Sequence, residues 1–237
     1  MSVGVFVYIC CKKNSTQSMK HLQKLLVVAT LGTFFSISNP LMAQTFEVGI
    51  RDGVSLSWLA GIENTRPLAG FYAGLTGDLY LGDHWGVGLD ITLSEQGVVC
   101  NENSDGVEIS YHYDYLNIPL SLSYRVGLGD KHTLQFMAGG QVGAFLLGKY
   151  AYTAPSVTND GFVSGEDWLD SESFHPYDFG VLVGLQWSVG NTAVEVRYTL
   201  GITQTHNGIS NTIGDRYYIS IPDNRNSVLQ IGTVFRF

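Results

Sequence analysis

The sequence predicts an all-β fold, an eight-stranded antiparallel up-and-down transmembrane β-barrel, and three observations predict it. Charged residues make up 14% of the 237 residues, whereas soluble domains usually contain about 25%. From residue 46 onward, apolar side chains alternate with small or polar ones at the period of two that is typical of strands. No stretch after about residue 43 has the ~20 consecutive apolar residues of a membrane helix, so a helical membrane protein is excluded.

Eight runs of about ten residues show this alternation, the length that crosses a bilayer when a strand is tilted. The apolar faces of the first four runs are Phe46, Val48, Ile50, Val54, Leu56 and Trp58; Phe71, Ala73, Leu75, Leu79 and Leu81; Trp85, Val87, Leu89, Ile91 and Leu93; and Leu116, Ile118, Leu120, Leu122 and Tyr124. Those of the last four are Leu134, Phe136, Ala138, Val142, Ala144 and Leu146; Phe179, Val181, Val183, Leu185, Trp187 and Val189; Val194, Val196, Tyr198, Leu200 and Ile202; and Leu229, Ile231, Thr233, Phe235 and Phe237.

Connections between the runs alternate between short and long, which predicts hairpins with short periplasmic turns, long external loops and periplasmic termini. The short ones are 82–84, 126–132 and 190–191, and the long ones are 59–66, 97–112, 150–176 and 203–226. A soluble barrel is the alternative, but its outer face would need many Lys and Glu. The second face here is mostly Gly, Ser, Thr and Gln, which suits a narrow polar interior.

The segment before the strands has the features of a secretory signal. Lys20 and Lys24 precede an apolar stretch, and Leu41-Met42-Ala43 is a plausible cleavage site. We therefore expect 1–43 to be a signal peptide, with Met19 as an alternative start, and 44–237 to be an outer-membrane β-barrel domain.

Removal of this signal makes the chain more acidic. Residues 1–43 contain four lysines and no acid, so the net charge changes from −8 to −12, which argues against nucleic acid as a partner. Only Cys100 remains, so no internal disulfide is expected.

Four short motifs carry a family resemblance over roughly 45–237. They are Gly49-Ile50-Arg51-Asp52-Gly53-Val54-Ser55-Leu56, Tyr115-Leu116-Asn117-Ile118-Pro119-Leu120, Glu195-Val196-Arg197-Tyr198 followed by Gly201, and the terminal Phe235-Arg236-Phe237. With them the chain resembles the eight-stranded outer-membrane barrels of the porin or PorT family, related in shape to OmpA and OmpX barrels. The resemblance implies outer-membrane localisation and insertion by the barrel-assembly machinery, which reads a terminal Phe such as Phe237. It also implies no particular activity, because PorT proteins that serve a secretion system share these motifs.

Charged residues on the inward face are the first candidates for a site, and we expect them to form a polar network that fills the barrel rather than an open pore. They are Glu47, Arg51, Asp78, Asp90, Lys149, Asp178, Glu195, Arg197 and Arg236. Strand ends suggest two pairs, Glu47 with Arg236 and Lys149 with Asp178. Asp52 falls on the lipid face, where an acid is unfavourable, and has no account from the sequence.

No catalytic, cofactor or metal residues are predicted. His112, His175 and His206 fall in or near external loops, close in sequence to Asp114, Ser173 and Asp178, but no H-x-x-x-H or HExxH spacing supports catalysis or a metal. The external 150–176 loop combines acids with aromatics and is either a recognition surface or a solvated acidic loop. Its acids are Asp160, Glu166, Asp167, Asp170 and Glu172, and its aromatics include Tyr152, Phe162, Trp168 and Phe174.

The resulting prediction is a structural or interaction barrel in outer-membrane lipid that binds an envelope or extracellular protein through its loops. An accessory barrel of a secretion or transport machine is the alternative. A barrel enzyme that modifies envelope lipid is the second alternative.

Overall fold

The computed structural model describes residues 44–59, 65–102, 107–155, 162–169, 174–206, 209–213, 217–221 and 224–237. The expected signal, 1–43, lies outside the described residues. Among the described residues, none forms a helix of the length and apolarity required to cross a membrane.

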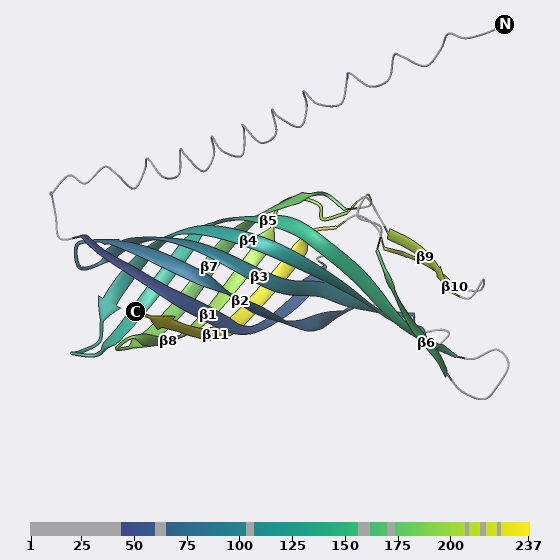
Figure 1. Ribbon diagram of the computed structural model, residues 1–237, viewed down its shortest axis with the longest axis horizontal. Helices are drawn as coiled ribbons and strands as arrows, with labels where there is room; N and C mark the ends of the chain where they lie inside the picture. The colour runs from purple at the N-terminus through teal and green to yellow at the C-terminus, as the bar shows by residue number, and fades with distance from the viewer. Residues whose placement is uncertain are drawn as a thin grey trace, which may run out of the picture. The chain divides into compact units, whose positions relative to one another are not determined.

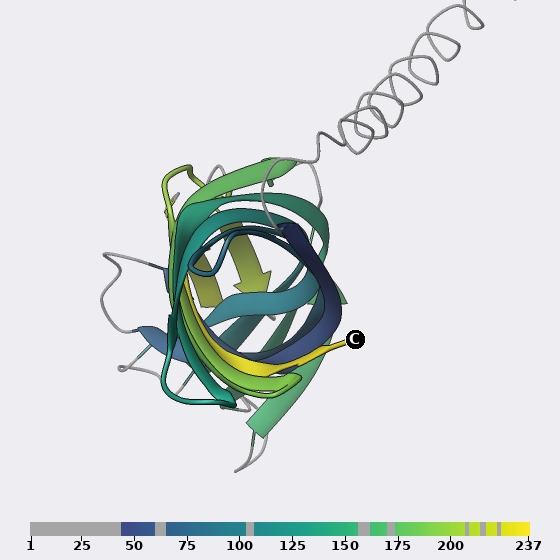
Figure 2. The ribbon, with the colours of Figure 1, turned by 90° about the vertical axis from the view of Figure 1, so that its left-hand side faces the viewer.

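Eight strands close into an antiparallel ring, as the alternation predicts (Figures 1 and 2). In ring order they are β1 (Gln44–Leu59), β2 (Thr65–Leu81), β3 (Trp85–Glu102), β4 (Val107–Gly127), β5 (His132–Pro155), β7 (Tyr177–Val189), β8 (Thr192–Gly201) and β11 (Asn226–Arg236). β11 pairs with β1, so Arg236 lies opposite Gly49 and the barrel has no open edge at this seam. The eight-stranded fold is therefore confirmed.

Side chains divide cleanly between the two faces of this ring. Apolar side chains of the predicted faces point outward and are exposed, for example Ile50 and Leu120 at 48% and 56%, whereas Ser55 and Gln186 on the opposite face are buried. A soluble barrel would reverse this arrangement, so the soluble alternative is wrong. Gly82 and Gly190 adopt positive φ values of 69° and 60° in the short turns, a conformation that glycine adopts without strain. We call the end with these turns the turn end and the opposite end the loop end.

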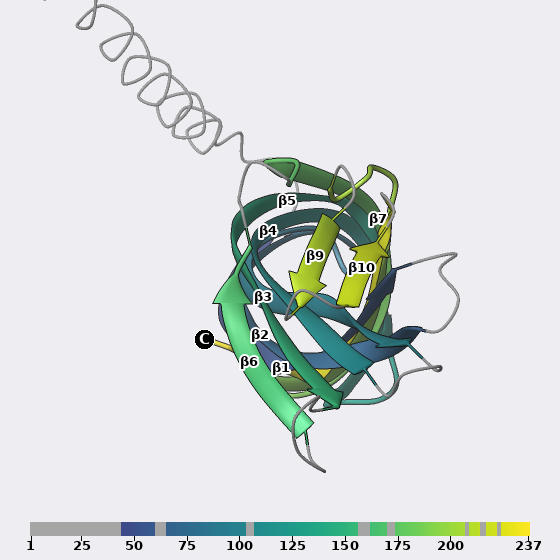
Figure 3. The same cartoon turned by 90° about the vertical axis from the view of Figure 1, so that its right-hand side faces the viewer.

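β3, β4 and β5 extend furthest beyond the apolar belt at the loop end, where the sequence predicts loops. β3, β4 and β5 have 18, 21 and 24 residues, so much of 97–112 and 150–176 is strand rather than loop. β6 (Phe162–Trp168) joins them by pairing with β5 from Lys149 to Pro155, beyond the last residue of β5 that pairs with β7. Figure 3 shows β6 at this end of the barrel. We call the four-stranded sheet formed by 95–102, 107–114, 148–155 and β6 the extension.

The extension has an apolar cluster of its own, which explains why these residues form strands. Its inward residues on β4 alternate with polar ones, and rings from later segments pack on them: Phe174 lies 5.1 Å from Tyr113 and 4.3 Å from Phe145 between ring centroids. The buried members are Leu59, Val98, Val107, Ile109, Tyr111, Tyr113, Tyr115, Ala154 and Phe174. We call this set the apolar cluster.

A register shift separates the barrel part of β5 from its extension. Tyr115 pairs with Phe145 while Asp114 pairs with Leu147, so β5 carries one additional residue between these two pairs. The bulge reverses the face of every later β5 residue, because side chains alternate with a period of two. Lys149 consequently pairs with His112 on the outer face, and its predicted inward position is wrong.

β9 (Ile209–Ile213) and β10 (Tyr217–Ile221) form a separate antiparallel hairpin. They pair with each other and, among the described residues, with no strand of the ring. Since β8 and β11 flank them in the chain, the hairpin belongs to the loop end.

Candidate functional site

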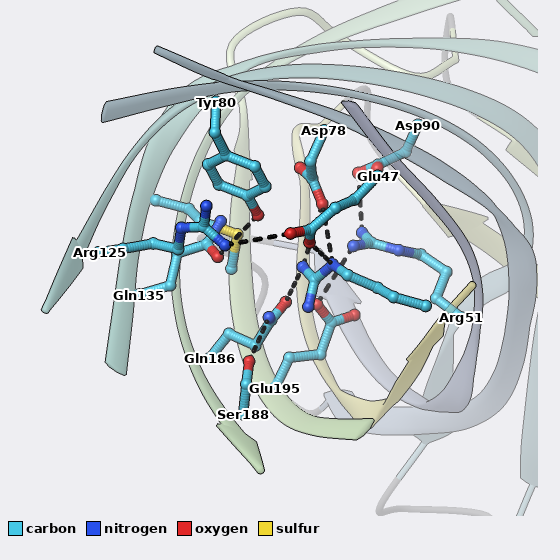
Figure 4. A network of polar contacts seen from close by, with 12 residues as sticks. Glu47, Arg51, Asp78, Tyr80, Asp90, Arg125, Gln135, Gln186, Ser188 and Glu195 are labelled. Carbon is cyan, nitrogen blue, oxygen red and sulfur yellow. Dashed lines mark hydrogen bonds and ion pairs between the residues drawn. The ribbon is translucent and has the colours of Figure 1, made fainter. Parts of the chain in front are cut away.

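Arg51, Asp90, Glu195 and Arg197 form a neutral cluster in the lumen, and Figure 4 labels the first three. Asp90 Oδ2 accepts hydrogen bonds of 2.7 Å from both Arg51 Nη1 and Arg197 Nη1, so one oxygen holds two guanidinium groups. Glu195 Oε2 lies 3.3 Å from Arg51 Nη2 and 3.2 Å from Arg197 Nε. All four side chains are at most 3% exposed. Two acids and two bases therefore compensate each other where an unpaired charge would be costly.

Tyr72 connects this cluster to the barrel wall and was missed by the sequence reasoning. Its hydroxyl donates to Glu195 Oε1 at 3.1 Å. Its ring lies over two paired glycines: a Cβ built on Gly53 would meet ring carbon Cε1 at 2.8 Å, and one on Gly232 would meet the hydroxyl at 2.3 Å. The absence of side chains at these two positions allows the tyrosine to reach the glutamate.

A second neutral cluster lies nearer the turn end. Arg236 donates to Asp78 Oδ2 at 3.0 Å and lies 3.3 Å from Glu47 Oε2, the partner that the strand ends suggest. Arg125 lies 3.4 Å from Glu47 Oε1, and its guanidinium carbon is 3.1 Å from the centroid of the Tyr80 ring. Arg125 was missed, although its odd position continues the inward phase of β4. A cavity of about 170 Å³ beside Glu47, Arg125 and Arg236 opens this cluster toward the turn end.

Uncharged side chains continue the network toward the loop end. Asn117 and Gln96 each donate to Ser94 Oγ at 2.7 Å, and Gln141 donates to Asn117 Oδ1 at 3.0 Å. Asn226 donates to Gln96 Oε1 and links β11 to β3. The apolar cluster follows directly after this layer, since Tyr115 and Asn117 are successive inward residues of β4. From the turn end to the loop end, the lumen thus passes from charged to polar to apolar filling.

The predicted pair of Lys149 and Asp178 does not form. Asp178 pairs with Gly143, six residues from Lys149 along β5, and its carboxylate accepts a 2.7 Å hydrogen bond from Thr203 Oγ1. Lys149 lies on the outer face, for the reason given by the β5 bulge. Neither residue belongs to the charged clusters of the lumen.

Asp52 has a partner that the sequence alone did not reveal. It lies on the outer face, directly opposite Thr233 of β11, and Thr233 Oγ1 donates to Asp52 Oδ1 at 2.6 Å. A hydrogen bond from the neighbouring strand lowers the cost of a carboxyl group at this position. Both side chains stay outside the lumen.

The three histidines have different surroundings. His112 faces outward and its Nδ1 lies 2.7 Å from Glu95 Oε1, whereas His206 is buried with its ring 5.9 Å from Phe174. His175 is joined to Thr205 through a backbone hydrogen bond of 3.0 Å. Within the part of the chain that the structure describes, no three His, Cys, Asp or Glu side chains form a group able to hold a metal ion. Ser173 lies outside the described residues.

The residues of the 150–176 segment have different roles. Phe174 is buried in the apolar cluster and is not part of a recognition surface, which corrects that expectation. Glu166, Asp167 and Trp168 lie on β6 and are exposed, and Phe162 is 70% exposed. Asp160, Asp170 and Glu172 lie outside the described residues.

Two titrating groups on the β4 part of the extension have shifted pKa values. Burial in the apolar cluster raises the pKa of Tyr113 well above its usual range. Partial burial, together with the neighbouring Glu95, raises the pKa of Asp114, which lies just beyond the apolar belt on the outer face. Both residues lie on β4, so the two faces of one strand meet an apolar interior and a charged exterior.

A closed eight-stranded ring with an apolar outer wall and a filled, charge-balanced lumen defines the class of outer-membrane β-barrel proteins. Within that class, the chain belongs to the family described as outer membrane protein beta-barrel domain, whose model matches residues 42–207. The protein is accordingly located in the outer membrane.

Solved structures with similar folds include three outer-membrane proteins. Ail, the attachment invasion locus protein of Yersinia pestis, in complex with the heparin analogue sucrose octasulfate, is 15% identical, with a TM-score of 0.39 over 83% of this chain and 100% of that one. OprG of Pseudomonas aeruginosa is 16% identical, with a TM-score of 0.42 over 83% and 98%. Neisserial surface protein A is 13% identical, with a TM-score of 0.39 over 82% and 99%. The search of curated proteins gave no match.

Proposed function

We propose that this protein is an interaction barrel, which anchors the extension in the outer membrane and presents it to an envelope or extracellular protein. The extension carries this proposal, because it continues past the apolar belt as paired strands with an apolar cluster of its own. Such a platform holds its exposed side chains in fixed positions, which lowers the ordering cost of binding.

The outer face of the extension supplies the contact groups. Glu108, Ser110, Thr153, Ser164 and Glu166 surround a shallow groove of about 340 Å³. Trp168 lies beside it, opposite Lys149, and is 67% exposed. Exposed tryptophan is enriched at protein-binding surfaces and among the residues that contribute most of the binding energy.

The free edge of β6 is the second contact element. β6 pairs with β5 along one side, and its other side has no strand partner among the described residues. The Trp168 N–H on that side donates to Asp167 Oδ1 at 2.8 Å, and the rest of this edge can pair with an extended segment of a partner.

Site-specific crosslinking tests this function. A photo-crosslinking residue at Ser164, on the outer face of β6, is expected to capture one dominant protein on cells, whereas the same residue at Asp130, in a short turn, is not. The captured protein, once purified, is expected to bind the barrel about tenfold more weakly after Trp168→Ser, because exposed aromatic anchors contribute most of the energy of such contacts. Equal capture at both positions would contradict the proposal, while capture of a secretion-machine subunit would assign the accessory role.

We further propose that residues 1–43 are a cleaved signal and that the barrel-assembly machinery recognises Phe237. The last residues close the barrel, since the Phe237 N–H donates to Val48 O at 2.9 Å and the Phe235 and Phe237 rings lie 5.4 Å apart. The turn end then lies in the periplasm and the loop end outside the cell, as in other barrels of this class.

A further inference from the structure

A groove of about 590 Å³ lies on the outside of the barrel where β7 begins and β8 ends. Its lining includes His175, Tyr177, Phe179, Ile202, Thr203 and Arg225. It is separate from the extension, whose own groove lies over β4, β5 and β6.

The part of this groove nearer the turn end continues the apolar belt. Phe179 lies on β7 and Ile202 directly follows β8; both face outward and are 47% and 54% exposed. The Ile202 N–H donates to Phe179 O at 2.7 Å, so the two residues form one surface. Tyr177 follows at 60% exposure, at the level where aromatic side chains meet the membrane–water interface.

The part of the groove nearer the loop end favours binding of an anion. Arg225 and His175 line it, and no Asp or Glu does, although the whole chain has 21 acids and 13 Lys and Arg residues. Among the described residues, no carboxylate oxygen lies within 4.0 Å of the Arg225 guanidinium nitrogens. A guanidinium binds phosphate through paired hydrogen bonds, and an imidazole can donate one in either charge state.

The backbone under these polar groups is held in place. Asn224 O accepts hydrogen bonds from the Thr205 N–H at 3.0 Å and from Thr205 Oγ1 at 3.1 Å. The His175 N–H in turn donates to Thr205 O at 3.0 Å. Thr205 therefore links both chain segments that carry the cationic and imidazole groups. Asp178, between Tyr177 and Phe179, accepts from Thr203 Oγ1 and is half-buried.

We propose that this groove binds one lipid of the outer leaflet that carries a phosphorylated glycolipid headgroup. Its acyl chains lie on Phe179 and Ile202, and a headgroup phosphate is bound by Arg225 with His175. The membrane supplies this occupant at a fixed depth, because the apolar part of the groove lies in the belt and the cationic part lies above it.

Native mass spectrometry of the purified full-length barrel in detergent tests the proposal, with lipid A and dephosphorylated lipid A as probes. The wild-type protein is expected to prefer the phosphorylated form, and Arg225→Gln to weaken lipid A binding about tenfold without changing binding of the dephosphorylated form. Ile202→Ser is expected to weaken both. Arg66→Gln is the matched control, because Arg66 is an exposed arginine paired with Glu108 on the extension.

Three results would overturn the proposal. The first is a wild-type protein without preference for the phosphorylated lipid, which needs no variant to be observed. The second is an equal loss in Arg66→Gln and Arg225→Gln, which would indicate only general surface charge. The third is displacement of lipid A by inorganic phosphate, which would indicate an anion site without lipid recognition. Heat-modifiable migration in gels establishes that each variant is folded before binding is compared.

Discussion

Asp90→Ala is expected to lower the free energy of unfolding by about 3–5 kcal/mol, the cost of removing one partner from a buried ion cluster. The structure sets this magnitude, because Asp90 Oδ2 is the common acceptor of two 2.7 Å bonds, from Arg51 and Arg197. After the substitution, two buried guanidinium groups share only Glu195. A neutral cluster then becomes a cationic one inside a closed barrel.

Restoring the charge balance is expected to recover part of the lost free energy of unfolding. In the double variant Asp90→Ala/Arg51→Ala, Glu195 and Arg197 remain as a single pair. The decrease in its free energy of unfolding is therefore expected to be smaller than the sum of the decreases in the two single variants. Asp83→Ala, which removes an acid from a short turn outside the network, serves as the control and is expected to change stability by less than about 0.5 kcal/mol.

Denaturant-induced unfolding in lipid vesicles, followed by tryptophan fluorescence, measures these free energies. A loss below about 1 kcal/mol for Asp90→Ala, or strictly additive losses in the double variant, would refute the reasoning that the cluster acts as one charge-balanced unit. Planar-bilayer recordings on the same proteins are expected to show no large, stable conductance. Porin-sized currents from the wild type would show that the lumen is not filled.

The remaining predictions concern the wall, the extension and the seam. Gly232→Ala is expected to impair folding, because its Cβ would lie 2.0 Å from Asp52 O, whereas Gly127→Ala, with no atom within 4 Å, is expected to be neutral; folding yields compare the two. The raised pKa of Asp114 means that the folded protein holds this proton more tightly than the unfolded chain, so stability is lost as the pH rises above the ordinary value of 3.8. Asp114→Asn should therefore raise the unfolding temperature at pH 7 but not below pH 3.8, and an equal change at both pH values would contradict this. Deletion of Phe237 is expected to reduce the amount of assembled barrel in cells more than deletion of residues 158–172, as quantified by heat-modifiable bands; equal yields would count against a role in assembly.

The barrel itself could be predicted from the sequence because a membrane-spanning strand must show one face to lipid and one to the lumen. Ile50, Leu120 and Val183 lie on the predicted face for this reason. Beyond the belt this constraint ends, and the strands of the extension were expected to be loops. The inward alternation of Ile109, Tyr111 and Tyr113 is nevertheless a strand pattern that continues beyond the belt.

The contacts inside the lumen were less accessible from the sequence. Arg51 and Asp90 lie 39 residues apart, on strands that are not neighbours, so their contact depends on the register of the whole ring. Lys149 shows the effect of a single residue, because the bulge after Phe145 moves it from the lumen to the outer face. A pattern with a period of two cannot locate such an insertion where both Leu146 and Leu147 are apolar.

Among the described residues, the apolar cluster fills the loop end of the lumen, and the turn end is polar. The cavity beside Glu47 opens the charged part of the lumen at the turn end, whereas packed tyrosine and phenylalanine rings fill the lumen at the loop end. The charged clusters therefore lie closest to solvent at the turn end, and the packed rings separate them from the loop end.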